Sequence, residues 1–188
     1  MEDNQKMKIV GLVGSLRKDS FNKAIMREAV KSSPEYAEIE IVEIDFPLFN
    51  QDLENDMPEV VKNFKQKIEA ADAVLIASPE YNYSVPGVLK NAIDWGSRPY
   101  GQSCFEGKPV GIMSAGVGML GGARAQYHLR QSFVFLNMHP LNRPEVMVPN
   151  AADKIENGEV KDAETKEKIS ELVKALVAKA KESKTSKS

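Results

Sequence analysis

LVGSLRKDSFNKAIMREAV, residues 12–30, is the stretch that decides the fold, because an apolar run ends at a glycine and a helical pattern begins a few residues later. Residues 7–14 (MKIVGLVG) are short and rich in branched apolar side chains, which is typical of a buried strand. The pattern of residues 20–31 predicts a helix after the polar loop. A strand, a short loop and a helix in this order predict the start of an alternating α/β fold.

The rest of the chain repeats this alternation. Further strands are predicted at residues 38–44, 73–79, 109–116 and 144–148. Further helices are predicted around residues 61–71, 85–96, 129–136 and 169–177. Continuous apolar strands alternating with helices predict a parallel sheet covered by helices on both faces. Five strands fit the doubly wound, flavodoxin-like order 2-1-3-4-5 better than the six-stranded dinucleotide fold, with ligands at the carboxyl ends of the strands.

Length and composition predict one ordinary globular domain. The chain has 188 residues, 42% of them hydrophobic and 28% charged, which suits a single domain over residues 1–188 with frayed ends at about 1–6 and 182–188. A net charge of −2 gives no electrostatic reason for a nucleic-acid partner. Without an apolar leader or a spanning run, we expect a cytoplasmic protein with no membrane insertion. The single cysteine, Cys104, excludes an intrachain disulfide, and we expect no metal site.

The loop after the first predicted strand has the chemistry of an anion site. Ser15, Ser20 and Asn22 offer short polar side chains, and Arg17 offers a planar cation. A helix that begins near Ser20 directs free N–H groups and its positive dipole end into the loop, which suits a phosphate. The spacing is neither a Walker loop nor G-x-G-x-x-G. A plain strand-to-helix turn capped by Ser20 is the alternative.

Two more distinctive loops follow the third and fourth predicted strands, at the same edge of the sheet. In residues 78–95 (SPEYNYSVPGVLKNAIDW), tyrosines beside exposed amides suit a flat heteroaromatic ligand, with ordinary surface tyrosines as the alternative. Residues 114–131 (SAGVGMLGGARAQYHLRQ) hold glycines that let the backbone approach a ligand closely, with a flexible loop as the alternative. A phosphate cradle, a ring clamp and a glycine-rich wall together fit a mononucleotide with a flat three-ring head, FMN.

The segments GSLRKDSFN (14–22), SPEYNYSVPGVLKNAIDWGSR (78–98) and GGARAQYHLRQ (121–131) resemble the NADPH-dependent FMN reductase family, most closely its bacterial quinone and chromate reductases, which overlap with azoreductases. The resemblance covers residues 8 to 150. It implies tightly bound FMN and two-electron transfer from NADPH or NADH to quinones and other oxidants such as azo dyes, chromate or flavins, in a homodimer or homotetramer. One open pocket shared by donor and acceptor makes a ping-pong route the expected kinetic pattern. The flavin N5 carries the hydride, so no catalytic side chain is implied.

The resemblance also implies the site residues. The FMN phosphate and ribityl chain are expected at Ser15, Leu16, Arg17, Lys18, Asp19, Ser20, Phe21 and Asn22. The ring is expected against Pro79, Glu80, Tyr81, Asn82 and Tyr83, with Ser114, Gly116 and Gly118 also reaching the flavin. Arg124, Tyr127 and Glu145 match positions that join subunits. Asp19 departs from the family, which often has glycine or a small residue there, and its carboxylate must point away from a phosphate.

Two other protein classes on this fold are open alternatives. A carrier flavodoxin binds FMN but does not oxidise NAD(P)H, and it usually has a hydroxyl-rich phosphate loop, where this chain has Arg17 and Lys18. A flavin-free receiver module needs clustered acidic residues where this chain has Gly14. Arg17 and Arg98 are candidates for the 2′-phosphate of NADPH. His128 is a candidate proton donor, and a helix-face or subunit-contact role is the alternative.

Overall fold

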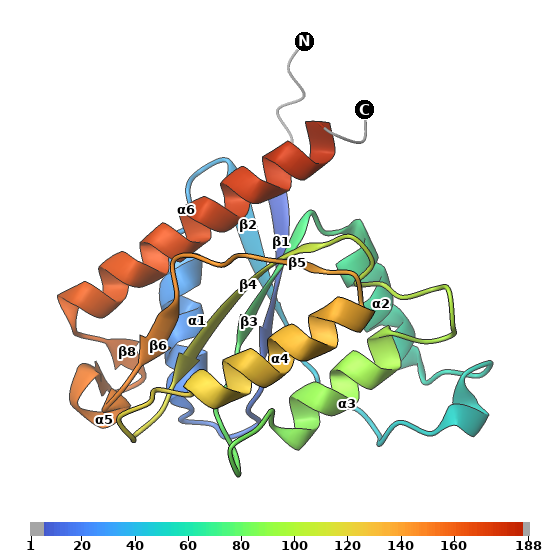
Figure 1. Cartoon of the computed structure of the whole chain (residues 1–188), viewed down its shortest axis with the longest axis horizontal. Helices are drawn as coiled ribbons and strands as arrows, with labels where there is room; N and C mark the ends of the chain where they lie inside the picture. Colours follow the sequence, from blue (N-terminus) through green and yellow to red (C-terminus); the bar gives the residue numbers. More distant parts are fainter. Residues whose placement is uncertain (1–5, 186–188) are drawn as a thin grey trace.

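The computed structural model describes residues 6–185 and shows a main sheet packed between helices (Figure 1). The strands of this sheet are β1 (Met7–Val13), β2 (Ala37–Val42), β3 (Ala73–Ala77), β4 (Pro109–Ala115), β5 (His139–Pro140) and β6 (Val146–Val148). The helices are α1 (Phe21–Lys31), α2 (Glu59–Ala70), α3 (Gly87–Gly96), α4 (Ala123–Phe135), α5 (Ala151–Lys154) and α6 (Ala163–Thr185), with a 3-10 helix η1 (Gln51–Leu53). A hairpin is formed by β7 (Ile155–Glu156) and β8 (Glu159–Val160).

The main sheet has the predicted order. Its strands run β2-β1-β3-β4-β5, and every pair is parallel. In this register Leu12 lies beside Val42, and Val13 lies beside Ala77. The flavodoxin-like order 2-1-3-4-5 with helices on both faces is confirmed.

The fifth position of the sheet is split between two short strands. β5 pairs with Pro109 and Val110 at the beginning of β4, whereas β6 pairs with the end of β4. The prediction of one strand over residues 144–148 is therefore wrong in its extent, because only residues 146–148 pair. Pro140 and Pro144 have no N–H group to donate, so a continuous ladder cannot pass through them.

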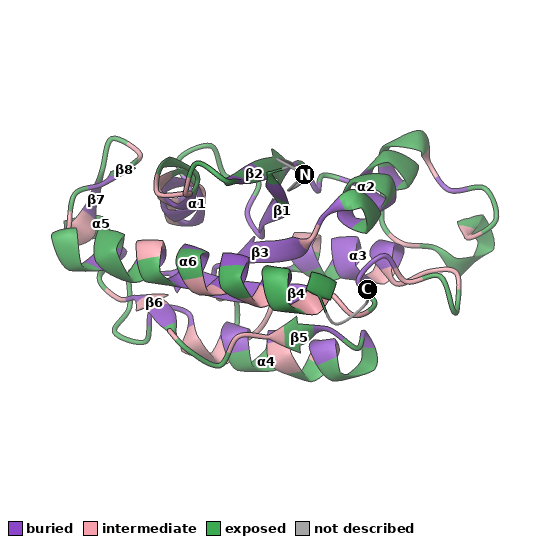
Figure 2. Cartoon of the chain, turned by 90° about the horizontal axis from the view of Figure 1, so that it is seen from above, coloured by how far each residue is buried: buried purple, intermediate pink, exposed green. Residues whose placement is uncertain are grey.

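Two hydrophobic clusters hold the helices to the two faces of the sheet. One cluster packs α1 and α6 on one face, through side chains such as Ile25 and Leu172. The other packs α2, α3 and α4 on the opposite face, through Phe64, Trp95 and Leu129. In Figure 2 the central strands are largely buried, and the helices are buried on the sides that face the sheet. Burial on both faces explains why the strands read as continuous apolar runs.

The loops after β1, β3 and β4 lie together at the carboxyl edge of the sheet, because α1, α3 and α4 return from that edge. The first helix begins where its sequence predicts. Ser20 has extended backbone angles, and its Oγ accepts a hydrogen bond of 3.2 Å from the Asn22 backbone N–H. Ser20 is thus the N-cap of α1.

The C-terminal third holds more structure than the sequence interpretation gave it. Asn157 and Gly158 have φ angles of 50° and 76°, typical of the tight turn that the Asn-Gly pair favours in a hairpin. Helix α6 continues to Thr185, so residues 182–185 are helical rather than frayed. The remaining parts of the two predicted frayed ends, residues 1–5 and 186–188, lie outside the described residues. The single-domain organisation stays a prediction.

Within residues 6–185, no helix combines the length and the apolar character needed to cross a bilayer.

Candidate functional site

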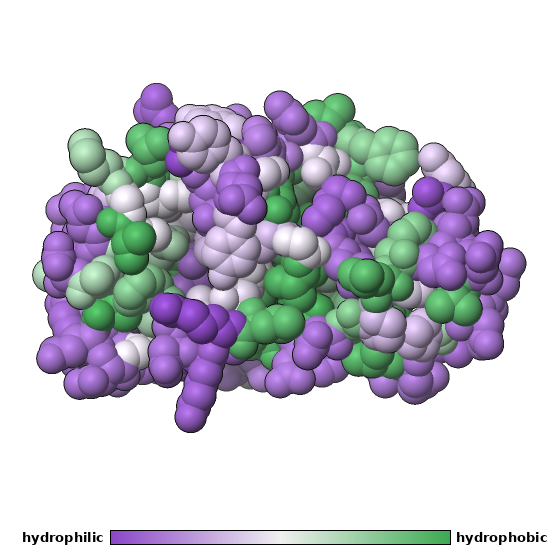
Figure 3. Space-filling view, turned by 90° about the horizontal axis from the view of Figure 1, so that it is seen from below, coloured by the Kyte–Doolittle hydropathy of each residue, from purple (hydrophilic) through white to green (hydrophobic). Residues whose placement is uncertain are grey.

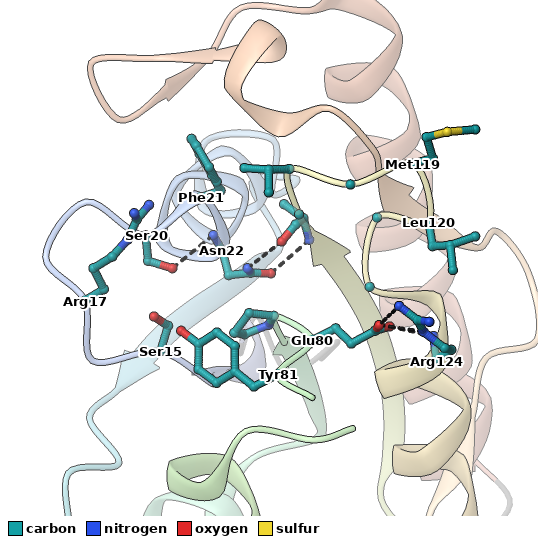
Figure 4. Close-up of a pocket in the computed structure, with 17 residues that line it drawn as sticks. Ser15, Arg17, Ser20, Phe21, Asn22, Glu80, Tyr81, Met119, Leu120 and Arg124 are labelled. Carbon is teal, nitrogen blue, oxygen red and sulfur yellow. Dashed lines mark hydrogen bonds and ion pairs between the residues drawn. The ribbon is translucent and has the colours of Figure 1, made fainter. Parts of the chain in front are cut away.

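The three loops at the carboxyl edge enclose a cavity of about 410 Å³, here called the edge cavity (Figure 4). One wall is the loop after β1 with the first turn of α1. The second wall is the loop after β3, and the third is the glycine-rich loop between β4 and α4. In Figure 4, Arg17 and Ser15 stand on one side of this space, and Met119 and Leu120 stand on the other.

Asn22 fixes the first wall to the third. It is 2% exposed, and its Nδ2 donates to the Ala115 carbonyl at 2.9 Å. The Ala115 N–H donates back to Asn22 Oδ1 at 3.0 Å. These two bonds imitate a strand pairing, and they join the first turn of α1 to the last residue of β4 (Figure 4). The loop after β1 therefore has a fixed position relative to the glycine-rich loop.

The first wall presents backbone donors. Among the described residues, none accepts a hydrogen bond from the backbone N–H groups of residues 16–21. These groups lie at the positive dipole end of α1. The Arg17 guanidinium donates to the Asp19 carbonyl and lies 5.2 Å from the centre of the Phe21 ring. Free N–H groups beside a cation form an anion site.

The second wall is a tight turn. Tyr81 and Ser84 exchange backbone hydrogen bonds of 3.1 and 2.9 Å. Between them, Asn82 and Tyr83 have φ angles of 49° and 65°. A left-handed tyrosine is uncommon and strained, which is a frequent feature of ligand-binding loops. Ser84 Oγ lies 2.9 Å from His128 Nδ1, so the turn is also tied to α4.

Glu80 ties this turn to the beginning of α4. Its carboxylate accepts hydrogen bonds from the backbone N–H groups of Arg124 and Ala125, at 3.0 and 3.3 Å, and from Arg124 Nε at 2.6 Å. Helix α4 has Gly122 at its N-cap, which offers no side-chain cap, so Glu80 caps the helix from another loop. The Arg124 guanidinium lies 3.4 Å from the centre of the Tyr83 ring. In Figure 4 the Glu80 carboxylate turns toward Arg124 and away from Ser15.

The charge of Glu80 is stabilised by these partners. Burial by itself raises the pKa of Glu80, but the hydrogen bonds from Arg124 and from the Ala125 backbone outweigh it and hold this pKa below its ordinary value. The hydrogen bond with Glu80 in turn raises the pKa of Arg124. Both groups are therefore ionised at neutral pH.

We expect Glu80→Gln to lower Tm by several degrees at neutral pH, at about 2–4 °C for each kcal/mol lost. The folded state lowers this pKa, so the carboxylate stabilises the protein above the ordinary value of 4.5, and the contribution is lost as pH falls through the lowered value. Thermal unfolding followed by circular dichroism from neutral to acidic pH should show the two proteins converging in acid. Glu159→Gln, which removes exposed ion pairs with Lys31 and Lys161, is the control and should shift Tm little. Equal Tm values for wild type and Glu80→Gln at neutral pH would contradict the capping role.

The third wall is held from beneath by buried polar groups. Ser114 is fully buried, and its Oγ donates to the Gly121 carbonyl at 2.6 Å. Gln126 Nε2 donates to Ser114 Oγ at 2.8 Å and to the Val146 carbonyl at 2.9 Å. A Cβ on Gly122, whose φ is 91°, would lie 2.7 Å from Ser114 Cβ. Only glycine fits there, and the loop rests directly on β4.

The mouth of the edge cavity is apolar and open. Val117, Met119 and Leu120 are 70%, 86% and 53% exposed, and Tyr81 is 50% exposed. Figure 3, which views the molecule from this side, shows apolar side chains reaching the surface among polar ones. Large apolar side chains that are exposed to solvent around a cavity suit the binding of a flat apolar ligand.

The structure brings most of the predicted site residues together. The edge cavity is lined by Ser15, Arg17, Ser20, Phe21, Asn22, Pro79, Glu80, Tyr81, Gly116 and Gly118. It is not lined by Leu16, Lys18, Asp19, Asn82, Tyr83 or Ser114. The expected contact of Ser114 with the flavin is not supported, because its hydroxyl is buried and used beneath the loop. Asp19 does not line the edge cavity, which is compatible with the expectation that its carboxylate points away from a phosphate.

Several lining residues were missed by the sequence interpretation. They are Ala115, Val117, Met119, Leu120 and, predicted only as a subunit contact, Arg124, whereas Gly121 and Gly122 belong to the predicted glycine-rich wall. The available signal was the apolar run between the glycines, since such residues in a loop have no core to enter. The other predicted subunit contacts lie together, with Tyr127 Oη 3.5 Å from Glu145 Oε1. Their intermolecular role stays a prediction.

The donors around the edge cavity fit FMN. The free N–H groups of residues 16–21 match a phosphate. Within the described part of the chain, the backbone N–H groups of Glu80, Asn82 and Tyr83 also donate to no acceptor, so they are available to the polar rim of a ring. Glycine-only positions in the third wall bring the backbone close to the same space.

Comparison with known proteins shows the family of this chain. Residues 7–153 match the model of the NADPH-dependent FMN reductase family. An NAD(P)H-dependent FMN reductase of Pseudomonas aeruginosa is 48% identical over 173 residues, 90% of this chain and 93% of the relative. A quinone reductase of Escherichia coli K12 is 44% identical over 168 residues, 86% of this chain and 89% of the relative.

A solved structure shares both fold and sequence. The flavoenzyme NAD(P)H:(acceptor) oxidoreductase FerB of Paracoccus denitrificans superimposes with a TM-score of 0.86 and 37% identity, covering 94% of this chain and 98% of that one. The chain therefore belongs to the NADPH-dependent FMN reductase family, and it is an oxidoreductase that uses FMN and NAD(P)H.

Proposed function

We propose that this enzyme takes two electrons from NADPH or NADH and passes them, by a ping-pong route, to quinones and other small acceptors such as azo dyes, chromate and free flavins. Relatives named 2-hydroxy-1,4-benzoquinone reductase and quinone reductase, 44% identical, support the quinone assignment. FMN held by the residues of the edge cavity would supply the two-electron chemistry that links the nicotinamide to the acceptor.

The observation that carries this proposal is the edge cavity itself, with backbone donors inside and an uncovered apolar mouth. The N–H groups of residues 16–21 and the Arg17 guanidinium hold the phosphate. The turn at residues 80–83 gives backbone donors to the ring, and Glu80 keeps this turn on α4. The exposed side chains of Tyr81, Met119 and Leu120 leave one apolar approach to the ring.

One shared approach supports the ping-pong route. The nicotinamide and the acceptor are both flat, and each must lie against the same open side of the cavity. Occupation by one excludes the other, so the oxidised donor leaves before the acceptor binds. The same uncovered mouth places little constraint on the acceptor's shape, which supports a broad range of small oxidants.

The decisive experiment is anaerobic stopped-flow spectroscopy of the FMN-loaded protein. We expect NADPH or NADH alone to bleach the flavin absorbance, and a quinone added afterwards to restore it. Failure of both nicotinamides to bleach bound flavin would contradict the proposal and favour a carrier flavodoxin. Reoxidation by azo dyes, chromate and free FMN in the same instrument ranks the acceptors.

We expect Arg17→Ala to weaken FMN retention by roughly 1.5–3 kcal/mol, the usual size of a hydrogen bond to a charged group. The flavin content after dialysis, measured by absorbance, gives the result. Lys18→Ala is the matched control, because it removes a neighbouring cation that does not line the edge cavity. Equal flavin loss from the two variants would mean that only general charge matters and would contradict a direct phosphate contact.

We also propose a homodimer or homotetramer in which Arg124, Tyr127 and Glu145 contact another subunit. Tyr127 is 53% exposed, and its hydroxyl is the only described contact with Glu145, at 3.5 Å. We expect Tyr127→Ala to reduce the assembly size in sedimentation velocity without loss of FMN. An unchanged sedimentation coefficient would remove Tyr127 from the interface. The cytoplasmic location stays a prediction.

A further inference from the structure

A second cavity of about 410 Å³ lies beside the edge cavity, across the loop that follows β1; we call it the side cavity. Ser15 lines both cavities, so this loop is their shared wall. The side cavity is bounded by Leu16 of the loop, by Lys23 and Arg27 of α1, and by residues 41–45 at the carboxyl end of β2. Of its lining residues, Ser15 and Leu16 were expected at the FMN phosphate and ribityl chain, and none was expected at the FMN ring.

The apolar wall of the side cavity is left uncovered by the fold. Ala37 and Ile39 lie on the face of β2 that packs against α1, and both are buried. Ile41 continues the same alternation, yet it is 44% exposed and lines the side cavity. Leu16, 53% exposed, lines it as well. Two large aliphatic side chains without a protein cover suit a flat, largely apolar ring.

The charged groups of the side cavity are suited to a nucleotide. Lys23 Nζ donates to the Leu16 carbonyl at 3.3 Å, and Arg27 Nη2 donates to the Gly158 carbonyl at 2.7 Å. Within residues 6–185 neither cation pairs with a carboxylate, so both are available to a phosphate. Glu43 and Asp45 follow β2 and make no side-chain hydrogen bond among the described residues. A carboxylate after the second strand is a suitable acceptor for ribose hydroxyls.

We propose that the side cavity binds the adenosine half of the reduced nicotinamide dinucleotide while its nicotinamide reaches the edge cavity. The adenine lies against Leu16 and Ile41, and the diphosphate crosses the shared loop near Lys23. The ribose hydroxyls meet the carboxylates, and an added 2′-phosphate meets Arg27. The proposal rests on the proposed function in one respect, namely that the donor's nicotinamide enters the edge cavity.

Calorimetric titration of the FMN-loaded protein with AMP, and separately with adenosine 2′,5′-bisphosphate, tests the side cavity without any turnover. We expect at least one of these probes to bind, and Ile41→Glu to weaken that binding about tenfold, which corresponds to about 1.4 kcal/mol. Val60→Glu is the matched control, because Val60 is 45% exposed and lies on α2, outside the side cavity. The Val60→Glu variant should bind the probes with the affinity of the wild type. Tighter binding of one probe identifies NADH or NADPH as the better donor.

Two results would overturn the proposal: neither probe binds the wild type, or Ile41→Glu binds them as tightly as Val60→Glu does. Steady-state kinetics give a second readout, in which Ile41→Glu raises the KM for the donor about tenfold while its FMN content stays that of the control. If the wild type oxidises no NAD(P)H, the proposed function fails, and the titration with the two probes still decides whether the side cavity binds a nucleotide.

Discussion

Asn22→Leu is expected to destabilise the protein by roughly 2–4 kcal/mol and to abolish retention of FMN. The substitution keeps the size of the side chain but removes both hydrogen bonds to Ala115, and it leaves a buried N–H and a buried carbonyl without partners. Thermal unfolding should show Tm lower by roughly 5–15 °C for a chain of this length. Flavin should be lost on dialysis, since the first turn of α1 is no longer fixed to the end of β4.

Asn91→Leu is the control that separates the loss of stability from the loss of FMN. Asn91 is also buried, and its side chain also bonds only backbone groups, accepting from the Phe49 N–H at 2.7 Å and donating to the Pro47 carbonyl at 3.1 Å. It does not line the edge cavity. We expect Asn91→Leu to lower Tm comparably and to keep its FMN. A folded Asn22→Leu protein with wild-type FMN affinity would show that the link between α1 and β4 has no part in the site.

Gly121→Ala is expected to destabilise the protein by roughly 2–5 kcal/mol and to weaken FMN binding. The backbone of Gly121 has a φ of 55°, where a side chain is strained by about 1–3 kcal/mol. The new Cβ would also lie 2.8 Å from the Val148 carbonyl carbon and 2.9 Å from the Pro149 nitrogen. Because these are backbone atoms, no rotamer change relieves the contact, and the glycine-rich loop or β6 must move. Chemical denaturation with a flavin-binding titration measures both effects.

Gly118→Ala is the control within the same loop. A Cβ on Gly118 meets nothing within 4 Å, and its φ lies outside the left-handed region. We expect its unfolding free energy to stay within about 0.5 kcal/mol of the wild type. Any loss of FMN affinity in Gly118→Ala then reports how closely the ligand approaches this loop. Equal unfolding free energies for Gly118→Ala and Gly121→Ala would contradict the close contact of Gly121 with the backbone of residues 148 and 149.

The sequence was most informative about features that depend on residues close together in the chain. The period of the apolar residues and the glycine that ends β1 predict the sheet, its order and the edge where ligands bind. Ser20 could be predicted as the N-cap because capping depends on residues only a few positions away. The Asn157–Gly158 hairpin was missed although its signal is equally local.

The sequence was not informative where side chains meet across long separations. Glu80 and Arg124 are both in the predicted site region, but their pairing depends on how two loops pack, and 44 positions separate them. Ser114 was expected to reach the flavin because the family resemblance implies it. The packing around β4 decides whether the Ser114 hydroxyl points into the edge cavity or toward Gln126, where it lies. A short sequence motif does not contain this information.

The split outer strand bears on how the protein avoids self-association through its sheet. A long exposed edge strand offers unpaired N–H and carbonyl groups on which another chain can assemble, a route to aggregation. Here one margin offers only the two residues of β5 and the three of β6, with Pro140 lacking a donor. The opposite margin, β2, carries the charged residues Glu38 and Glu40, the second paired with Lys67, and charged side chains on an edge strand oppose pairing with another chain. Short outer strands, a proline and charged residues at the two margins therefore disfavour extension of this sheet into another chain.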